Sequence, residues 1–529
     1  MTHRFETSGS DRRLEFTTTS QLQELEKTLS RVMFQSRDIH NMFSSKDRVL
    51  PDDVLYLVLE QACVVQAQPA PSPWEHSSIF YGSSRFSQST ARVLSCVCRR
   101  WRSLLLSNPV VWSDARITIK RPENLFWLDT CLARSAAASA GCMVRIDQPL
   151  GINQGVNIAE AISRHPSNIR CLEISPRARE DYAFLASKMD NLERLHIKAG
   201  TYSRTPLPTP SHLTKLRVLI LQRLPAVPHD SFSNITDLTL STIVSPMANL
   251  VDVLQTNEAL EILRINRTAV SADPLRRLVS LPNLKLLCIS HSSPVTILHM
   301  LSPLPIPSRV IIHDDVTNSV TSDVSALFNP FLIFGPNDPV RTASISVLPG
   351  EAPITFHTLG GATVEITVQV SSLPEDEHIG EFFLLLGDVA RWGPFPNLCS
   401  LNLHIETSAT EHLHTIMIKA LISVAPRLTH LSISGRTLFH HVCQALHSGL
   451  VCPELEYFRG VLHPNDPIDN SLRSLSETLK RRATAIRTIV LDIPLREEEI
   501  RGILSETGLS IEEMKSHGVD QFSLNSTTK

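Results

Sequence analysis

The sequence has no marked excess of either charge and no long apolar run. Its 50 Lys and Arg residues nearly balance 53 Asp and Glu residues, and the net charge of −3 gives no electrostatic reason to expect a nucleic acid or an anionic membrane as partner. No stretch approaches the roughly 18 uninterrupted apolar residues of a membrane-spanning helix, and the first residues lack the apolar core of a secretory signal. We therefore expect an intracellular protein, cytoplasmic or nuclear, with no membrane partner.

Catalytic signatures are missing as well. The chain contains no G-x-S-x-G elbow, no phosphate-binding loop, no G-x-G-x-x-G fingerprint and no H-E-x-x-H zinc motif. We expect a non-catalytic protein without a cofactor. An enzymatic alternative would require a deep pocket with converging polar groups, for which the region 295–390 is the remaining place.

Cysteines and histidines offer only weak metal candidates. The ten cysteines lie mostly in apolar segments, which favours buried free thiols in a reducing compartment. The best metal-binding pattern is on one face of an expected helix, and a second histidine group flanks an expected strand. Histidines and cysteines on such helices are usually surface and core residues, so we expect no metal site. The candidate residues are His440, His441, Cys443 and His447, and then His404, His412 and His414.

The length of 529 residues and the 42% hydrophobic content predict several domains or one long repeat array. Residues 1–20 are polar and aperiodic, and we expect a flexible leader. Residues 21–48 contain a short amphipathic helix with apolar residues at Leu22, Leu25 and Leu29. It is too short for a stable coiled coil, so packing on a neighbour is favoured over dimerisation.

From about residue 165 an apolar triplet of the form L-x-x-L-x-L recurs. Six copies begin between Ile169 and Leu284 at intervals of 23, 24, 19, 25 and 24 residues, and four more begin at Leu398, Leu428, Leu455 and Ile486. Helical patterns lie between them, so each unit reads as strand, loop, helix and return, the form of a leucine-rich repeat. We expect a connector over 116–164, an irregular array over 165–495 with a degenerate stretch near 295–390, and a C-terminal cap and tail over 496–529.

The residues between the triplet leucines are the candidate ligand surface of such an array. They alternate with the buried leucines and would project from the concave sheet. A basic group, Lys480 to Arg482, fits the negative end of a helix better than a nuclear localisation patch. The candidate sheet residues are Glu193, Arg194, His196, Arg217, Lys285 and Asn402.

Two apolar helix patterns lie within residues 49–115. In "LPDDVLYLVLEQA", Pro51 suits the first turn of a helix and two aspartates favour its positive end. In "ARVLSCVCRRWRSLLLSNPVVW", helical spacing predicts one helix from near Thr90 to Asn108, with Cys98 in the core stripe. The arginines of this segment fit a solvated face. A loop of some 25 residues separates the two patterns.

Together these two patterns resemble an F-box, in the elongated form common in mushroom-forming fungi. The expected fold class is α/β: a small all-α F-box-like helical module followed by an irregular leucine-rich-repeat solenoid. The resemblance implies a substrate-recognition subunit of a cullin-RING (SCF-type) ubiquitin ligase. The module would dock on a Skp-type adaptor and through it on a cullin, and the repeats would bind a protein substrate of unknown identity.

By this resemblance the adaptor-binding residues are Leu50, Pro51, Val54, Leu55, Val58, Leu94, Val97 and Trp101. Some of them must instead form the core of the module, and the sequence does not divide the two sets. The alternative is a leucine-rich-repeat interaction scaffold that is not linked to a ubiquitin ligase. The two hypotheses differ in whether the apolar stripe of the module faces solvent.

Overall fold

The structure is a computed structural model that describes part of the chain in two compact units. The first unit comprises Met1–Ala67 and Ser84–Trp112, and the second comprises the remaining residues. The expected leader over 1–20 and helix over 21–48 lie outside the described residues. Those residues are 50–64, 88–118, 123–137, 141–147, 158–175, 185, 187–199, 213–224, 227, 232, 234–271, 278–290, 292, 297–298, 300–301, 307–315, 339–347, 351–369, 397–405, 418–419, 421–423, 425–435, 438–447, 451–462, 468–481, 486–493 and 521–526.

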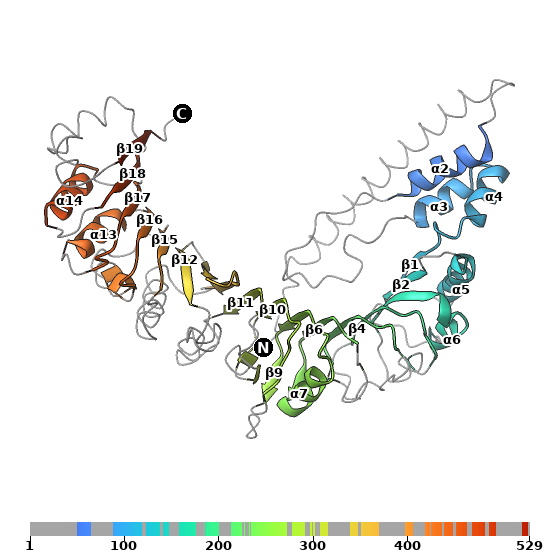
Figure 1. Cartoon of the computed structure of the whole chain (residues 1–529). Helices are drawn as coiled ribbons and strands as arrows, with labels where there is room; N and C mark the ends of the chain where they lie inside the picture. Colours follow the sequence, from blue (N-terminus) through green and yellow to red (C-terminus); the bar gives the residue numbers. More distant parts are fainter. Residues whose placement is uncertain are drawn as a thin grey trace, which may run out of the picture. The chain divides into compact units, whose positions relative to one another are not determined.

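The first unit contains helices α2 (Asp52–Cys63), α3 (Gln88–Ser95) and α4 (Arg99–Ser107) in its described part (Figure 1). Pro51 stands at the N-terminus of α2, as expected. The prediction of a single helix from Thr90 to Asn108 was wrong, because α3 ends at Ser95 and α4 begins separately at Arg99. Cys98 is extended, with φ −155°, and its Sγ accepts a hydrogen bond from the Trp101 N–H at 3.4 Å. Cys98 is therefore an exposed helix cap and not the core residue that we expected.

The core of the first unit is built around Trp112. Its indole Nε1 donates a 2.7 Å hydrogen bond to the Leu105 carbonyl, so the ring is buried with its polar atom satisfied. Burial also raises the pKa of the Cys63 thiol to about 11, which makes it unreactive at neutral pH. The other buried apolar residues are Leu55, Leu59, Ala91, Leu94, Leu105 and Val111.

The second unit is built on one sheet of 17 described strands. They pair in the spatial order β1, β2, β3, β4, β5, β6, β8, β10, β11, β14, β13, β12, β15, β16, β17, β18, β19, and every pairing is parallel except the two made by β13. The bounds are β1 Asp114–Thr118, β2 Cys142–Asp147, β3 Ile169–Ile174, β4 Arg194–Lys198, β5 Val218–Gln222, β6 Asp237–Ser241, β8 Ile262–Asn266, β10 Leu286–Ser290, β11 Arg309–Asp315, β12 Val340–Val347, β13 Glu351–Thr358, β14 Thr363–Gln369, β15 Ser400–Ile405, β16 His430–Gly435, β17 Tyr457–Val461, β18 Thr488–Ile493 and β19 Gln521–Ser526.

All ten apolar triplets coincide with strands of this sheet, so the repeat prediction is confirmed. In most repeats the strand begins two residues after the first apolar residue, as where β4 begins at Arg194 after Leu192. Leu192 itself is buried and closes a turn through its N–H to the Met189 carbonyl. The arrangement of one parallel strand per repeat is the leucine-rich-repeat fold.

Helices connect several strands, and α7 and α13 lie where helical patterns between the triplets predicted them. The described ones are α5 (Glu123–Ser135), α6 (Ile158–Ser163), α7 (Met247–Gln255), α13 (Leu438–Leu446) and α14 (Ile468–Arg481), with a short 3-10 turn at Pro166–Asn168. A two-stranded sheet of β7 (Val244–Pro246) and β9 (Ala269–Ser271) accompanies the main sheet. Helices α13 and α14 are joined where the Thr478 hydroxyl donates to the Cys443 carbonyl at 2.9 Å.

The boundaries of the array differ from the expected ones. The expected connector over 116–164 contains strand β2 and helices α5 and α6, and β1 and β2 already belong to the sheet. The expected cap over 496–529 contributes strand β19, which pairs with β18. Neither β1 nor β2 carries the L-x-x-L-x-L triplet, and this is why the sequence did not reveal them as repeats.

The stretch near 295–390, expected to hold degenerate repeats, contains the described strands β11, β12, β13 and β14 and interrupts the repeat order. Strand β12 pairs with β15, β14 pairs with β11, and β13 runs antiparallel between β12 and β14. Gly361, with φ +88°, lies in the turn between β13 and β14, a conformation that glycine adopts without steric cost. The sheet therefore continues through this stretch by a meander instead of by degenerate repeats.

Asparagines that directly precede the triplets tie neighbouring repeats together. The Nδ2 groups of Asn191, Asn234 and Asn283 donate to the carbonyls of Ser167, Thr214 and Glu258, at 2.7, 3.3 and 3.0 Å. These partners are 24, 20 and 25 residues away, about one repeat. The same hydrogen bond therefore recurs along the edge of the array.

Gly460 provides a test of the packing in the C-terminal repeats. A Cβ at this position would lie 2.3 Å from Cε2 of Phe439, the α13 side chain that packs on β17 beside Phe458. We expect Gly460→Ala to lower the free energy of unfolding by about 1–3 kcal/mol through overpacking. Chemical denaturation should detect this loss. The same change in a Phe439→Leu background should cost less, and equal costs in both backgrounds would contradict the assignment.

Candidate protein-docking surfaces

The structure divides the eight candidate adaptor-binding residues into core and surface. Leu55 and Leu94 are buried in the core of the first unit. Val54, Val58 and Val97 are 38%, 45% and 47% exposed. Of the remaining three, Pro51 is exposed, and Leu50 and Trp101 are half-buried. The packing of α3 and α4 against α2 decides which side of the stripe remains open.

The open side of α2 is an apolar face formed by Val54, Leu57 and Val58. Leu57 is 64% exposed and was not among the predicted site residues. Val54, Leu57 and Val58 stand at positions i, i+3 and i+4 of the helix. Their side chains therefore share one side of α2. That spacing was visible in the sequence, but the buried stripe of Leu55 and Leu59 obscured it.

Two polar contacts hold α2 beside α4. The Arg100 Nε donates to Oδ1 of Asp52 at 2.7 Å, and its Nη2 contacts the same carboxylate and donates to the Leu50 carbonyl. At the far ends of the two helices, Asn108 Nδ2 donates to Oε2 of Glu60 at 3.4 Å. The N-terminal ends of the two helices lie side by side, and so do their C-terminal ends. Helices α2 and α4 therefore run parallel. The ion pair is exposed and contributes mainly orientation, since such pairs add at most about 1 kcal/mol.

The strands of the repeat sheet bury their leucines on one face, and we call the opposite face the outer face. It carries three of the six candidate ligand residues. Arg194 and Asn402 are exposed on β4 and β15, as expected. His196 is only 2% exposed, so the expectation that it offers a ligand surface was wrong. It lies beside the buried Glu173, with 3.6 Å between Nδ1 and Oε1, because β3 and β4 align the two residues directly.

The other three candidates, Glu193, Arg217 and Lys285, precede the strands instead of lying on them. Two of these are engaged in ion pairs between repeats. Glu193 pairs with Arg170 at 2.7 Å, and Lys285 pairs with Glu261 at 2.9 Å. These residues form the amino-terminal edge of the sheet, and Arg217 is exposed there.

Further ion pairs cross the outer face between strands. Arg264 contacts Asp237 at 2.7 Å, Arg309 contacts Glu365 at 2.9 Å, and Arg459 contacts Asp492 at 2.8 Å. Burial raises the pKa of Asp237, although the neighbouring Arg264 guanidinium opposes that shift. Hydrogen bonds to Glu365 and Asp492 raise the pKa values of Arg309 and Arg459, respectively. These carboxylates thus neutralise much of the positive charge on this face.

The described metal candidates do not form a metal-binding group. Among the described residues no group of three or more His, Cys, Asp or Glu side chains could hold a metal ion. Cys443 is buried, which raises the pKa of its thiol. His440 contacts Gln444 at 2.8 Å, and His447 contacts Arg481. His412 and His414 lie outside the described residues.

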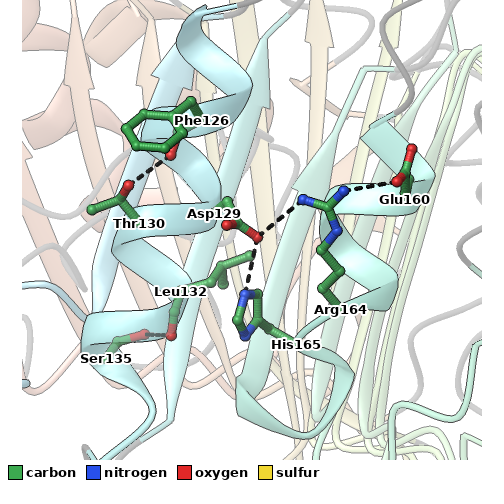
Figure 2. Close-up of polar contacts among 8 residues, drawn as sticks. All are labelled: Phe126, Asp129, Thr130, Leu132, Ser135, Glu160, Arg164 and His165. Carbon is green, nitrogen blue, oxygen red and sulfur yellow. Dashed lines mark hydrogen bonds and ion pairs between the residues drawn. The ribbon is translucent and has the colours of Figure 1, made fainter.

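A polar network between α5 and α6 was not singled out from the sequence. Figure 2 shows Asp129 between His165, whose Nε2 lies 3.1 Å from Oδ1, and Arg164, at 3.7 Å. Arg164, directly after α6, also pairs with Glu160 of that helix at 2.7 Å. The network links the helices of successive repeats, and nearby Phe126 is 75% exposed. Within α5, the Thr130 hydroxyl donates to the Phe126 carbonyl at 2.8 Å.

No family model and no curated protein matches the chain. Among solved structures, an internalin (InlF) from Listeria monocytogenes is similar, with 12% sequence identity over 69% of this chain and 89% of that chain, at a TM-score of 0.23. The fold assignment rests on the recurring parallel strands of the structure itself. No helix of the described residues is long and apolar enough to cross a membrane.

The division of α2 into a core side and an open side is directly testable. Leu55→Ala should destabilise the first unit by about 2–5 kcal/mol through the cavity that it leaves. Val58→Ala, on the open side, should change stability by less than about 0.5 kcal/mol. Hydrogen exchange measured by mass spectrometry should show faster exchange in α2 and α4 for the first variant alone. Faster exchange in both variants would place Val58 in the core.

Proposed function

We propose that the chain is a non-catalytic substrate receptor of a cullin-RING ubiquitin ligase. Its helical unit would act as an F-box that docks on a Skp-type adaptor, and its repeat sheet would hold a protein substrate. The observation that carries the proposal is the apolar face of Val54, Leu57 and Val58, which stays exposed while the unit has a separate buried core. Ubiquitin transfer would be carried out by the partner subunits.

Energetics support a protein partner for this face. Full burial of a Val or Leu side chain is worth about 1.5–3 kcal/mol, and three such side chains lie on one side of α2. The core of the first unit is formed without these three side chains, because Leu55, Leu59 and Trp112 already fill it. The exposed face therefore adds nothing to the described core and gains most by binding another apolar surface.

A second candidate is a leucine-rich-repeat scaffold that has no link to a ubiquitin ligase. The observation that favours it is that no family model matches the helical unit. In this case the apolar face of α2 would bind a different protein. The repeat sheet would serve the same purpose in both candidates, so adaptor binding distinguishes them.

Binding of the full chain to a purified Skp-type adaptor tests the proposal. We expect binding by the wild type, and at least about a tenfold loss in a Val54→Asp, Val58→Asp variant, because two charges would enter an apolar contact. Both side chains are exposed, so the variant should remain folded, which hydrogen exchange can verify. Leu359→Asp is the matched control, because Leu359 is 64% exposed in the repeat unit. A folded wild type that does not bind would favour the scaffold.

A further inference from the structure

Charged residues are distributed unevenly between the two ends of strands β4 to β8. At the amino ends, the acidic residues Glu193, Asp237 and Glu261 are each paired with a basic residue at 2.7–2.9 Å. At the carboxyl ends, Lys198, Arg223 and Arg267 are exposed, and no carboxylate of the described residues lies within ion-pair distance of them. We call these three residues the basic edge.

Backbone hydrogen bonds place the two arginines of the basic edge in one row. The N–H of Arg223, one residue past β5, donates to the Ser241 carbonyl at 2.8 Å. Thr242 donates in the same way to Asn266 at 2.8 Å, and Arg267 to Ser290 at 2.9 Å. The two arginines are therefore two strand steps apart, about 10 Å at the usual spacing of 4.8 Å. On β4, one step further, the equivalent hydrogen bond is made by the N–H of Ala199, and Lys198 directly precedes that residue at the end of the strand.

The backbone at these positions favours residues other than arginine. Arg223, Thr242 and Arg267 have φ values of 57°, 56° and 47°, in the left-handed region. Glycine or asparagine adopts that conformation at lower cost. Two long cationic side chains thus occupy equivalent positions in spite of an unfavourable backbone, and strain of this kind is concentrated at functional sites.

A polar side chain beside the basic edge indicates the kind of ligand. Asn266, at the end of β8, has an Oδ1 atom that is buried and has no hydrogen-bond partner. The amide of a bound peptide could supply the missing N–H after rotation of this side chain. A nucleic acid backbone presents mainly acceptors, and three cations are few for a nucleic-acid site in a chain of net charge −3.

We propose that the carboxyl ends of β4, β5, β6 and β8 bind an extended acidic peptide segment. Its carboxylates pair with the basic edge, and the guanidinium groups can engage them bidentately. About four or five extended residues, at 3.3 Å each, span the three strand steps. This inference rests on the proposed function in that it names the substrate segment of the receptor, but peptide binding does not require the adaptor.

The test measures binding of the full chain to a fluorescein-labelled peptide of alternating glutamate and serine. The wild type should bind it, more weakly as salt is raised. Arg223→Asn with Arg267→Asn should weaken binding at least about tenfold, because both charge-assisted contacts are lost. Asparagine tolerates the left-handed backbone, so this variant should keep its fold. Arg217→Asn, at the opposite edge, is the matched control and should bind like the wild type.

Four results would overturn the inference: no binding of the acidic peptide by the wild type, equal binding by the double variant and the control, equal binding of a glutamine–serine peptide, or tighter binding of single-stranded RNA than of the acidic peptide. Adaptor binding by the same variants separates the two proposals. If the double variant loses peptide binding but still binds the adaptor, the substitutions act on the basic edge and not on the fold of the helical unit. Peptide binding by a chain that does not bind the adaptor would leave this inference standing and refute the ligase role. A chain that binds the adaptor but not the peptide would refute this inference alone.

Discussion

The register of the parallel sheet is the constraint on which the repeat unit depends. Leu195, Leu219, Leu238, Leu263 and Leu287 stand opposite one another on successive strands, and all five are buried. A slip by one residue would turn each of them to the outer face. One repeat alone could not bury such a leucine on both sides. The hydrophobic driving force therefore acts between repeats and extends the ladder from strand to strand.

The same register determines the chemistry of the outer face. Residues that alternate with the leucines stand opposite one another on neighbouring strands. Arg145 faces Glu173 in this way, and Glu173 faces His196. Opposite charges on adjacent strands are stabilising and like charges are not, which favours pairwise neutralisation within the ladder. Arg223 and Arg267 lie just beyond the strands, where this constraint ends. Charge that is free to engage a partner is thus found at the edge of the sheet.

Sequence reasoning recovered the strands that carry the apolar triplet because the signal repeats with a nearly constant period. It missed the pairing of β13, since alternation along a strand is the same for parallel and antiparallel neighbours. It also joined α3 to α4, because helical spacing continues through Cys98 and neither glycine nor proline marks the break. The cap formed by the Cys98 thiol is a contact with the Trp101 N–H, and no pattern of hydrophobicity encodes it.

The helical unit shows why composition alone could not separate its core from its surface. Val54 and Leu55 are adjacent and similarly apolar, yet one is 38% exposed and the other 5%. The difference arises from the packing of α3 and α4 against α2, in which Arg100 and Asn108 align α4 with α2. A small unit has a marginal core, so an apolar surface left outside it is costly unless another protein covers it. The polar contacts that orient α4 therefore also determine which residues of α2 remain available to a partner.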